Sequence, residues 1–165
     1  HAVTLVRNEA SMVPLPDGPV HVLSLVPEAR IPEGAAGQPT LSAMLRTLQR
    51  PARDVLLSAG DSWDGATGGG VMIVVTHSRG RPSPWQVDLV RRAYEAHGDR
   101  LVVVATGTPY DLAYLPPVST YVATHGREPV LLMAAARMLL GAAPPRGRLP
   151  ITIPGSYPVG HGIVW

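Results

Sequence analysis

The 165-residue sequence contains no cysteine, no phenylalanine and no lysine. The lack of cysteine excludes disulfides, thiol catalysis and thiolate metal sites, and it leaves the redox compartment undetermined. All 14 basic residues are therefore arginines, and because they are opposed by 12 acids the net charge is only +2. The arginines are scattered along the chain and form no dense basic stripe, so we expect no nucleic-acid partner.

Long apolar runs are also missing. No run reaches the roughly 18–20 residues that span a bilayer, so we expect no membrane partner. The N-terminus has no basic-then-apolar signal pattern, and any export signal would lie upstream. His1 leads directly into a strand-like stretch at residues 2–6, as expected for a domain excised from a longer protein. The location of the protein in or outside the cell stays open.

The composition that is present, 45% hydrophobic and 16% charged residues, is that of an ordinary globular protein. Its length predicts a single domain over residues 1–165. A complete TIM barrel needs about 200 residues at least, so the chain cannot contain one.

Apolar runs alternate with helical patterns along the chain. The runs at 54–58 and 71–75 are continuously apolar, as in strands covered on both faces, whereas Pro150 indicates an edge position for the last run. The expected strands are 2–6, 20–26, 54–58, 71–75, 101–105, 121–123 and 149–153, and residues 27–39 are expected to form a loop.

Helix starts and stops are marked by capping residues. The clearest start is Ser83-Pro84-Trp85-Gln86, a capping box with proline at the first helical position, and Gly98 ends that helix. The other expected helices are one capped by Thr40 with Leu41, Met44, Leu45 and Leu48 on one face, a short one from Thr108 through a capping Asp111, and one from Pro129 to Leu140. The alternation predicts an α/β fold: an open, mostly parallel, doubly wound sheet with helices on both faces.

Two groups of polar residues follow the carboxyl ends of expected strands, where parallel sheets bind ligands. Asp61, Trp63 and Asp64 follow residues 54–58, and a tryptophan between two carboxylates can stack on a sugar ring. His77 and Arg79 follow residues 71–75. These five residues are the candidates for contact with a ligand, and none of them is expected to be catalytic.

Other motifs argue against particular chemistries. The glycine stretch at 65–70 precedes a strand and has no following Gly-Lys-Ser/Thr, so a flexible surface loop is favoured over a phosphate loop. No two of the six histidines form a metal-binding pair on a helix, and no Gly-x-Ser-x-Gly elbow is present. We expect no metal and no cofactor. The residues alone indicate a doubly wound domain without a convincing catalytic set.

Several stretches, taken in order, resemble the C-terminal domain of family 3 glycoside hydrolases, in the β-N-acetylhexosaminidase branch. The most specific piece is Pro109-Tyr110-Asp111-Leu112. The resemblance extends over residues 2–9, 13–15, 71–90, 102–112, 134–137, 147–154 and 157–163.

This resemblance implies a two-domain parent enzyme that removes β-linked N-acetylhexosamine, with cell-wall fragments as the expected source. Its nucleophilic aspartate and histidine-led acid/base would lie in an N-terminal TIM barrel, the implied partner of this chain. In the β-glucosidase branch the C-terminal domain donates a glutamate, but this sequence has Thr76-His77-Ser78-Arg79-Gly80 at the corresponding place and no glutamate between Glu33 and Glu95. The hexosaminidase branch is therefore favoured.

Three functional hypotheses follow. The first is an accessory domain that packs on a barrel, has no turnover alone and exposes apolar surface where the barrel would lie. The second is a standalone module that binds carbohydrate or peptidoglycan, and the third is an independent enzyme of the same fold.

Overall fold

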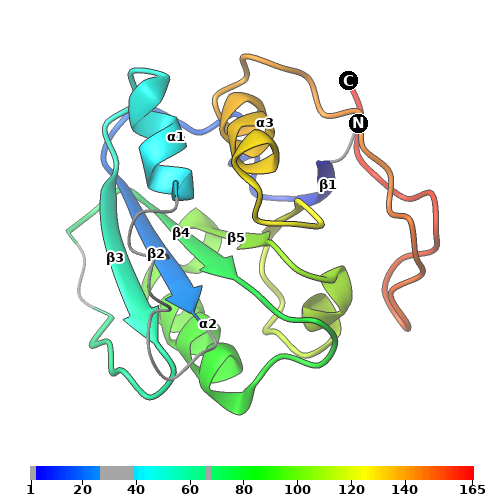
Figure 1. The fold of residues 1–165 in the computed structure, drawn as a ribbon, viewed down its shortest axis with the longest axis horizontal. Helices are drawn as coiled ribbons and strands as arrows, with labels where there is room; N and C mark the ends of the chain where they lie inside the picture. The colour runs from blue at the N-terminus through cyan, green and yellow to red at the C-terminus, as the bar shows by residue number, and fades with distance from the viewer. Residues whose placement is uncertain (1–2, 27–38, 66–67) are drawn as a thin grey trace.

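The computed structural model describes residues 3–26, 39–65 and 68–165, and its centre is one six-stranded sheet. The strand order is β1-β6-β5-β4-β2-β3, in which β1 pairs antiparallel with β6 and all other neighbours are parallel. The elements are β1 (Thr4–Asn8), β2 (Val20–Val26), α1 (Leu41–Thr47), β3 (Arg53–Ser58), β4 (Val71–Thr76), α2 (Pro84–His97), the 3-10 turn η2 (Gly98–Arg100), β5 (Leu101–Ala105), the 3-10 turn η3 (Pro109–Ala113), β6 (Thr120–Ala123) and α3 (Pro129–Leu139) (Figure 1).

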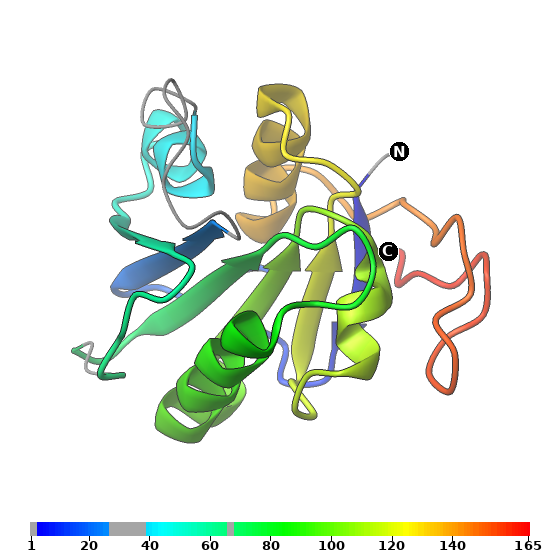
Figure 2. The ribbon, with the colours of Figure 1, turned by 60° about the horizontal axis from the view of Figure 1, so that its bottom comes forward.

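Helices cover both faces of this sheet. Figure 2 shows α1 and α3 on one face and α2 with η3 on the other. Each face has its own apolar cluster, and every residue of β4 and β5 is buried between the two. The predicted α/β doubly wound fold is confirmed. No helix among the described residues is long and apolar enough to cross a bilayer.

The predicted caps of α1 and α2 form as the local sequence requires, whereas the Thr108 side chain makes no cap hydrogen bond at the start of η3. The Ser83 hydroxyl accepts a hydrogen bond from the Gln86 main-chain N–H, and Gly98 ends α2 with a positive φ of 54°. The Thr40 hydroxyl accepts from the Ala43 N–H at the start of α1. These contacts lie within four residues along the chain, so the sequence predicts them directly.

The prediction that residues 54–58 are covered on both faces is wrong for the first half of β3. This strand is at the sheet edge, Arg53 to Val55 are exposed, and only Leu57 and Ser58 are buried. The cause lies in the neighbouring elements. The helix α1 is only seven residues long, and the described part of the β3–β4 connection contains no helix.

The expected strand at 149–153 does not form. Pro150 within it and Pro154 directly after it cannot donate main-chain hydrogen bonds, and the segment instead folds back on itself. The Leu149 N–H donates to His161 O at 2.8 Å, and Ile153 forms an isolated bridge with Tyr157. Leu149 and Ile153 are nevertheless buried in the core.

The large exposed apolar side chains are not gathered in one place. Val55 is on β3, Tyr114 follows η3 and Val130 is on the first turn of α3, whereas Val159, Val164 and Trp165 belong to the C-terminal segment. The expected loop at 27–39 lies outside the described residues except for its last residue, as do Ala2 of the expected first strand and residues 66–67 of the glycine stretch.

Candidate functional site

A groove of about 460 Å³ lies over the carboxyl ends of the three adjacent strands β4, β5 and β6. The segments that follow these strands line it, and their polar side chains face one shared edge of the sheet. Parallel α/β sheets bind ligands at this edge because loops from neighbouring strands meet there. The lining residues are His77, Ser78, Arg79, Thr106, Gly107, Thr108, Pro109, His125, Gly126, Arg127, Glu128, Pro150 and Ile151.

The main chain of His77 is held by a buried side chain of α2. The Gln86 Oε1 accepts from the His77 N–H at 3.0 Å, and the Gln86 Nε2 donates to the His77 carbonyl at 2.9 Å. The sequence predicts that Gln86 belongs to a capping box at the start of α2. The structure corrects this prediction, because the Gln86 side chain instead makes both hydrogen bonds to the main chain directly after β4. It positions the start of the segment from His77 to Arg79 independently of any ligand.

The ring of His77 has a defined tautomer when it is neutral. Its Nδ1 lies 3.2 Å from the Thr106 Oγ1, and that hydroxyl donates its single hydrogen to the Thr76 carbonyl at 2.8 Å. The Nδ1 must therefore carry a hydrogen and donate to Thr106, which leaves the Nε2 as the unprotonated nitrogen of the neutral ring.

Close packing of the loops requires Gly107. The Thr108 N–H donates to the Ser78 carbonyl at 2.8 Å, and a Cβ atom added to Gly107 would lie only 1.8 Å from the same carbonyl oxygen. No other residue type fits without moving the main chain. The Ser78 hydroxyl is enclosed here and has no hydrogen-bond partner among the described residues.

A second histidine lines the groove from the end of β6. His125 adopts a positive φ of 60°, and its Nε2 lies 3.2 Å from the Thr4 Oγ1 of β1. Burial lowers the pKa of His125, because the protonated ring loses hydration. The antiparallel pairing of β1 with β6 thus brings a residue near the N-terminus to the site.

A buried carboxylate lies at the same end of the sheet. Asp111 accepts hydrogen bonds from the Thr76 hydroxyl at 2.7 Å and from the Tyr121 hydroxyl. Burial raises the pKa of Asp111, although both hydroxyls partly oppose the shift, and burial also raises the pKa of Tyr121. The expected structural role of Asp111 agrees with this placement, but its partners are on β4 and β6, far away in sequence.

The structure separates the five predicted ligand residues into two groups. His77 and Arg79 line the groove, whereas Asp61, Trp63 and Asp64 belong to the β3–β4 connection. Their contact with a ligand stays a prediction for both groups.

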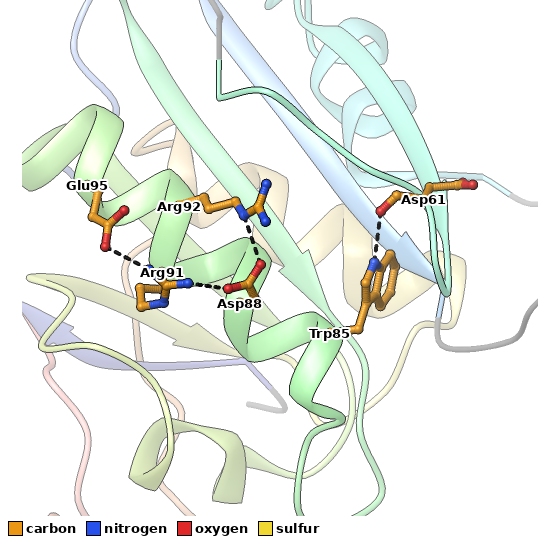
Figure 3. Close-up of polar contacts among 6 residues, drawn as sticks. All are labelled: Asp61, Trp85, Asp88, Arg91, Arg92 and Glu95. Atoms are coloured by element: carbon orange, nitrogen blue, oxygen red, sulfur yellow. Dashed lines mark hydrogen bonds and ion pairs between the residues drawn. The ribbon is translucent and has the colours of Figure 1, made fainter.

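The β3–β4 connection packs along α2. The Asp61 Oδ2 accepts from the Ser58 N–H at 2.7 Å, and the Asp61 carbonyl accepts from the Trp85 indole N–H at 2.9 Å (Figure 3). The Trp63 ring stacks on the His97 ring with centroids 6.3 Å apart. Asp61 and Asp64 are nevertheless exposed, and Trp63 is half-buried.

Asp64 borders a separate hollow formed with the exposed side of α2. The cations of that helix already have acidic partners within it. Asp88 accepts from both Arg91 and Arg92, and Glu95 accepts from Arg91, as Figure 3 shows. The positive charges of Arg91 and Arg92 are therefore paired with acids on their own helix.

The groove contains few acidic groups. Glu128 is the one carboxylate among its lining residues, whereas histidines, arginines and hydroxyls are several. Glycoside hydrolysis by the usual route uses two carboxyl groups on either side of the bond. The described residues contain no group of three histidine or acidic side chains that could hold a metal ion.

Comparison with known proteins extends this description. No family model matches the chain, and no curated protein does. Among solved structures, a fungal multi-domain GH3 beta-N-acetylglucosaminidase matches 95% of this chain and 18% of its own, with 24% identity and a TM-score of 0.74.

Two further matches are bacterial. A glycoside hydrolase family 3 beta-N-acetylglucosaminidase from Paenibacillus sp. str. FPU-7 has 24% identity and a TM-score of 0.60, over 84% of this chain and 28% of its own. A beta-glucosidase from Listeria innocua has 14% identity and a TM-score of 0.74, over 99% of this chain and 32% of its own. This chain therefore spans less than a third of the length of these three proteins and has the fold of an α/β portion of family 3 glycoside hydrolase structures.

Proposed function

We propose that this chain is the accessory C-terminal domain of a larger family 3 glycoside hydrolase, and that it has no turnover by itself. The parent enzyme would hydrolyse β-linked N-acetylhexosamine glycosides with a catalytic set in an N-terminal TIM barrel. Two lines support this branch: the ordered sequence motifs that include Pro109 to Leu112, and the higher identity to the two beta-N-acetylglucosaminidases, 24%, than to the Listeria beta-glucosidase, 14%.

The composition of the groove carries the proposal. A retaining glycosidase has its two carboxyl groups about 5–5.5 Å apart, and an inverting one about 6.5–9.5 Å, with both facing the sugar. Glu128 is the single lining carboxylate, and Asp111 is fully buried with its oxygens bonded to Thr76 and Tyr121. The groove therefore lacks both a carboxylate pair and an accessible form of the nucleophilic aspartate that the resemblance implies, so the nucleophile would come from outside the groove, as a separate barrel would provide.

Within this function the groove would contact the sugar or the loops of the barrel around it. His77 and Arg79 are our first candidates for substrate contact because they line it. Asp61, Trp63 and Asp64 rank behind them because the Trp63 ring already stacks on His97. Hydroxyl groups of a sugar can accept hydrogen bonds from arginine and donate to an unprotonated imidazole nitrogen.

The test is hydrolysis of a fluorogenic N-acetyl-β-glucosaminide by the purified 165-residue chain, with the corresponding β-glucoside measured beside it. We expect no turnover above buffer for either substrate. Turnover that disappears in Glu128→Gln, but persists in the matched control Glu95→Gln on the far part of α2, would contradict the proposal, because it would place a catalytic acid in this chain.

A binding measurement on the same sample separates the alternative of a standalone module. Saturable binding of a chitooligosaccharide that weakens in Arg79→Gln and is unchanged in Arg92→Gln would favour a carbohydrate-binding module. Binding that appears only when the barrel is added would favour the accessory domain.

A further inference from the structure

A second pocket, of about 390 Å³, lies at the amino ends of the strands, at the opposite end of the sheet from the groove. It is formed where β2 and β3 begin and where the chain enters β4. Three basic side chains, His21, Arg46 and Arg53, line it together with Gly68 and Gly69. Its remaining lining residues are apolar prolines, a valine and an alanine, so no acid contributes to it.

The ring of His21 has an unused hydrogen-bonding group at this place. Its Nε2 is enclosed by protein and has no hydrogen-bond partner among the described residues. The parallel register places His21 opposite Arg53 of β3 and Met72 of β4, so histidine and arginine are cross-strand neighbours. Enclosed polar nitrogens nearly always have a partner, because an unpaired one loses hydration without compensation. A buried water would be a suitable partner for this nitrogen, while other atoms of His21 line the pocket.

Arginine side chains lie at this pocket, and no acid is among its lining residues. The Arg46 Nη1 donates to the Ala52 carbonyl at 3.0 Å, and Arg53 is exposed. A Cβ atom added to Gly69 would lie 3.9 Å from the Arg100 Nη1, so a third arginine borders the glycines. The ion pairs formed within the described part of the chain include none of these three arginines.

The pKa of His97 is lowered in part by one of these arginines. Burial is the main cause that lowers the pKa of His97, and the positive charge of Arg100 lowers it further. The chain has a net charge of only +2, so two arginines that line a pocket with no acid among its lining residues, and a third beside its glycines, are a local concentration of charge and do not reflect the average surface.

We propose that this pocket binds a small organic phosphate. A phosphate monoester carries between one and two negative charges and three acceptor oxygens, which match cations that approach from separate elements. A carboxylate offers two oxygens and one charge. The apolar wall, with Pro19 and Pro51, would contact the organic part of the ligand. The sequence argues against a phosphate loop at the glycine pair, because the pair precedes a strand. In this pocket the two glycines have no side chains that would obstruct entry of the ligand.

The experiment is a titration of the 165-residue chain with phenyl phosphate, inorganic phosphate and benzoate at constant ionic strength, followed by the ring resonances of His21 in NMR spectra. We expect saturable shifts with phenyl phosphate, weaker binding of inorganic phosphate, and weaker binding still of benzoate. Arg53→Gln should weaken the binding of phenyl phosphate roughly tenfold, the loss expected for one charge-assisted hydrogen bond. Its matched control is Arg146→Gln, an equal charge change at an exposed position outside the pocket, and it should leave the affinity unchanged.

Three results would overturn the proposal. Shifts that do not saturate at millimolar phenyl phosphate would mean that no site exists. Equal weakening by Arg53→Gln and Arg146→Gln would mean that net charge alone attracts the anion. Benzoate that binds as tightly as phenyl phosphate would refute the phosphate assignment. Arg53 is exposed, so its variant should fold, and circular dichroism of each variant verifies this.

Discussion

Replacement of Gln86 by leucine tests how the segment after β4 is held in place. The side chain of Gln86 is buried, and its amide makes two hydrogen bonds with the main chain of His77. Leucine has a similar volume but no polar atoms, so it leaves one N–H and one C=O of His77 without these partners. An unsatisfied buried polar group costs about 1–3 kcal/mol. Because the bonds are only partly buried, we expect Gln86→Leu to lower the free energy of unfolding by about 2–4 kcal/mol.

The assay is urea unfolding followed by circular dichroism, with Gln49→Leu as the control because it makes the same exchange at an exposed position. The control should change stability by less than about 0.5 kcal/mol. Gln86→Glu should lose at least as much stability as Gln86→Leu, since its buried carboxylate still accepts from the His77 N–H but loses hydration and faces the His77 carbonyl oxygen. A loss below about 1 kcal/mol in Gln86→Leu, with the slope of the transition unchanged, would refute the reasoning.

Three other perturbations have expected outcomes. Gly107→Ala should lower the melting temperature measurably, because a methyl group 1.8 Å from the Ser78 carbonyl oxygen forces the main chain apart, whereas Gly80→Ala, which meets nothing within 4 Å, should not. Burial raises the pKa of Asp111 in the folded protein above its ordinary value of 3.8. The ionisation of Asp111 therefore lowers stability as the pH rises from 3.8 through this higher folded-state pKa, and the unfolding midpoints of Asp111→Asn should lose that pH dependence. Burial is the first cause that lowers the pKa of His97 in the folded protein below its ordinary value of 6.5. The stability that neutral His97 contributes is therefore present above pH 6.5 and is lost as the pH falls through the lower folded-state pKa, so His97→Gln should lose this acid-side fall in melting temperature.

Local signals along the chain predicted most of the elements. Ser83 and Gly98 mark the ends of α2 because their capping contacts involve residues at most four positions away. The apolar runs of β4 and β5 are long enough to identify strands buried on both faces. Prediction failed for residues 149–153, where apolar alternation suggests a strand but prolines prevent the pairing that a strand needs.

The candidate site was only partly predictable. His77 and Arg79 could be named because they follow a strand, and the same rule applied to β6 would have found His125. No local sequence pattern predicts the contact of Gln86 with His77 or that of Asp111 with Tyr121, because each contact joins separate elements. The stacking of Trp63 on His97 was hidden for the same reason, and a tryptophan beside two acids suggested a sugar contact instead.

The sequence by itself determined the alternation of strands and helices, and with it the doubly wound α/β class, because hydrophobic period and capping act over a few residues. Only the tertiary structure decided the order of the strands, the antiparallel pairing of β1, the exposed edge position of β3 and the two pockets at opposite ends of the sheet. The physical reason is that each of these depends on contacts between segments far apart along the chain. Such contacts form according to which surfaces fit and which polar groups find partners, and no local pattern records that outcome.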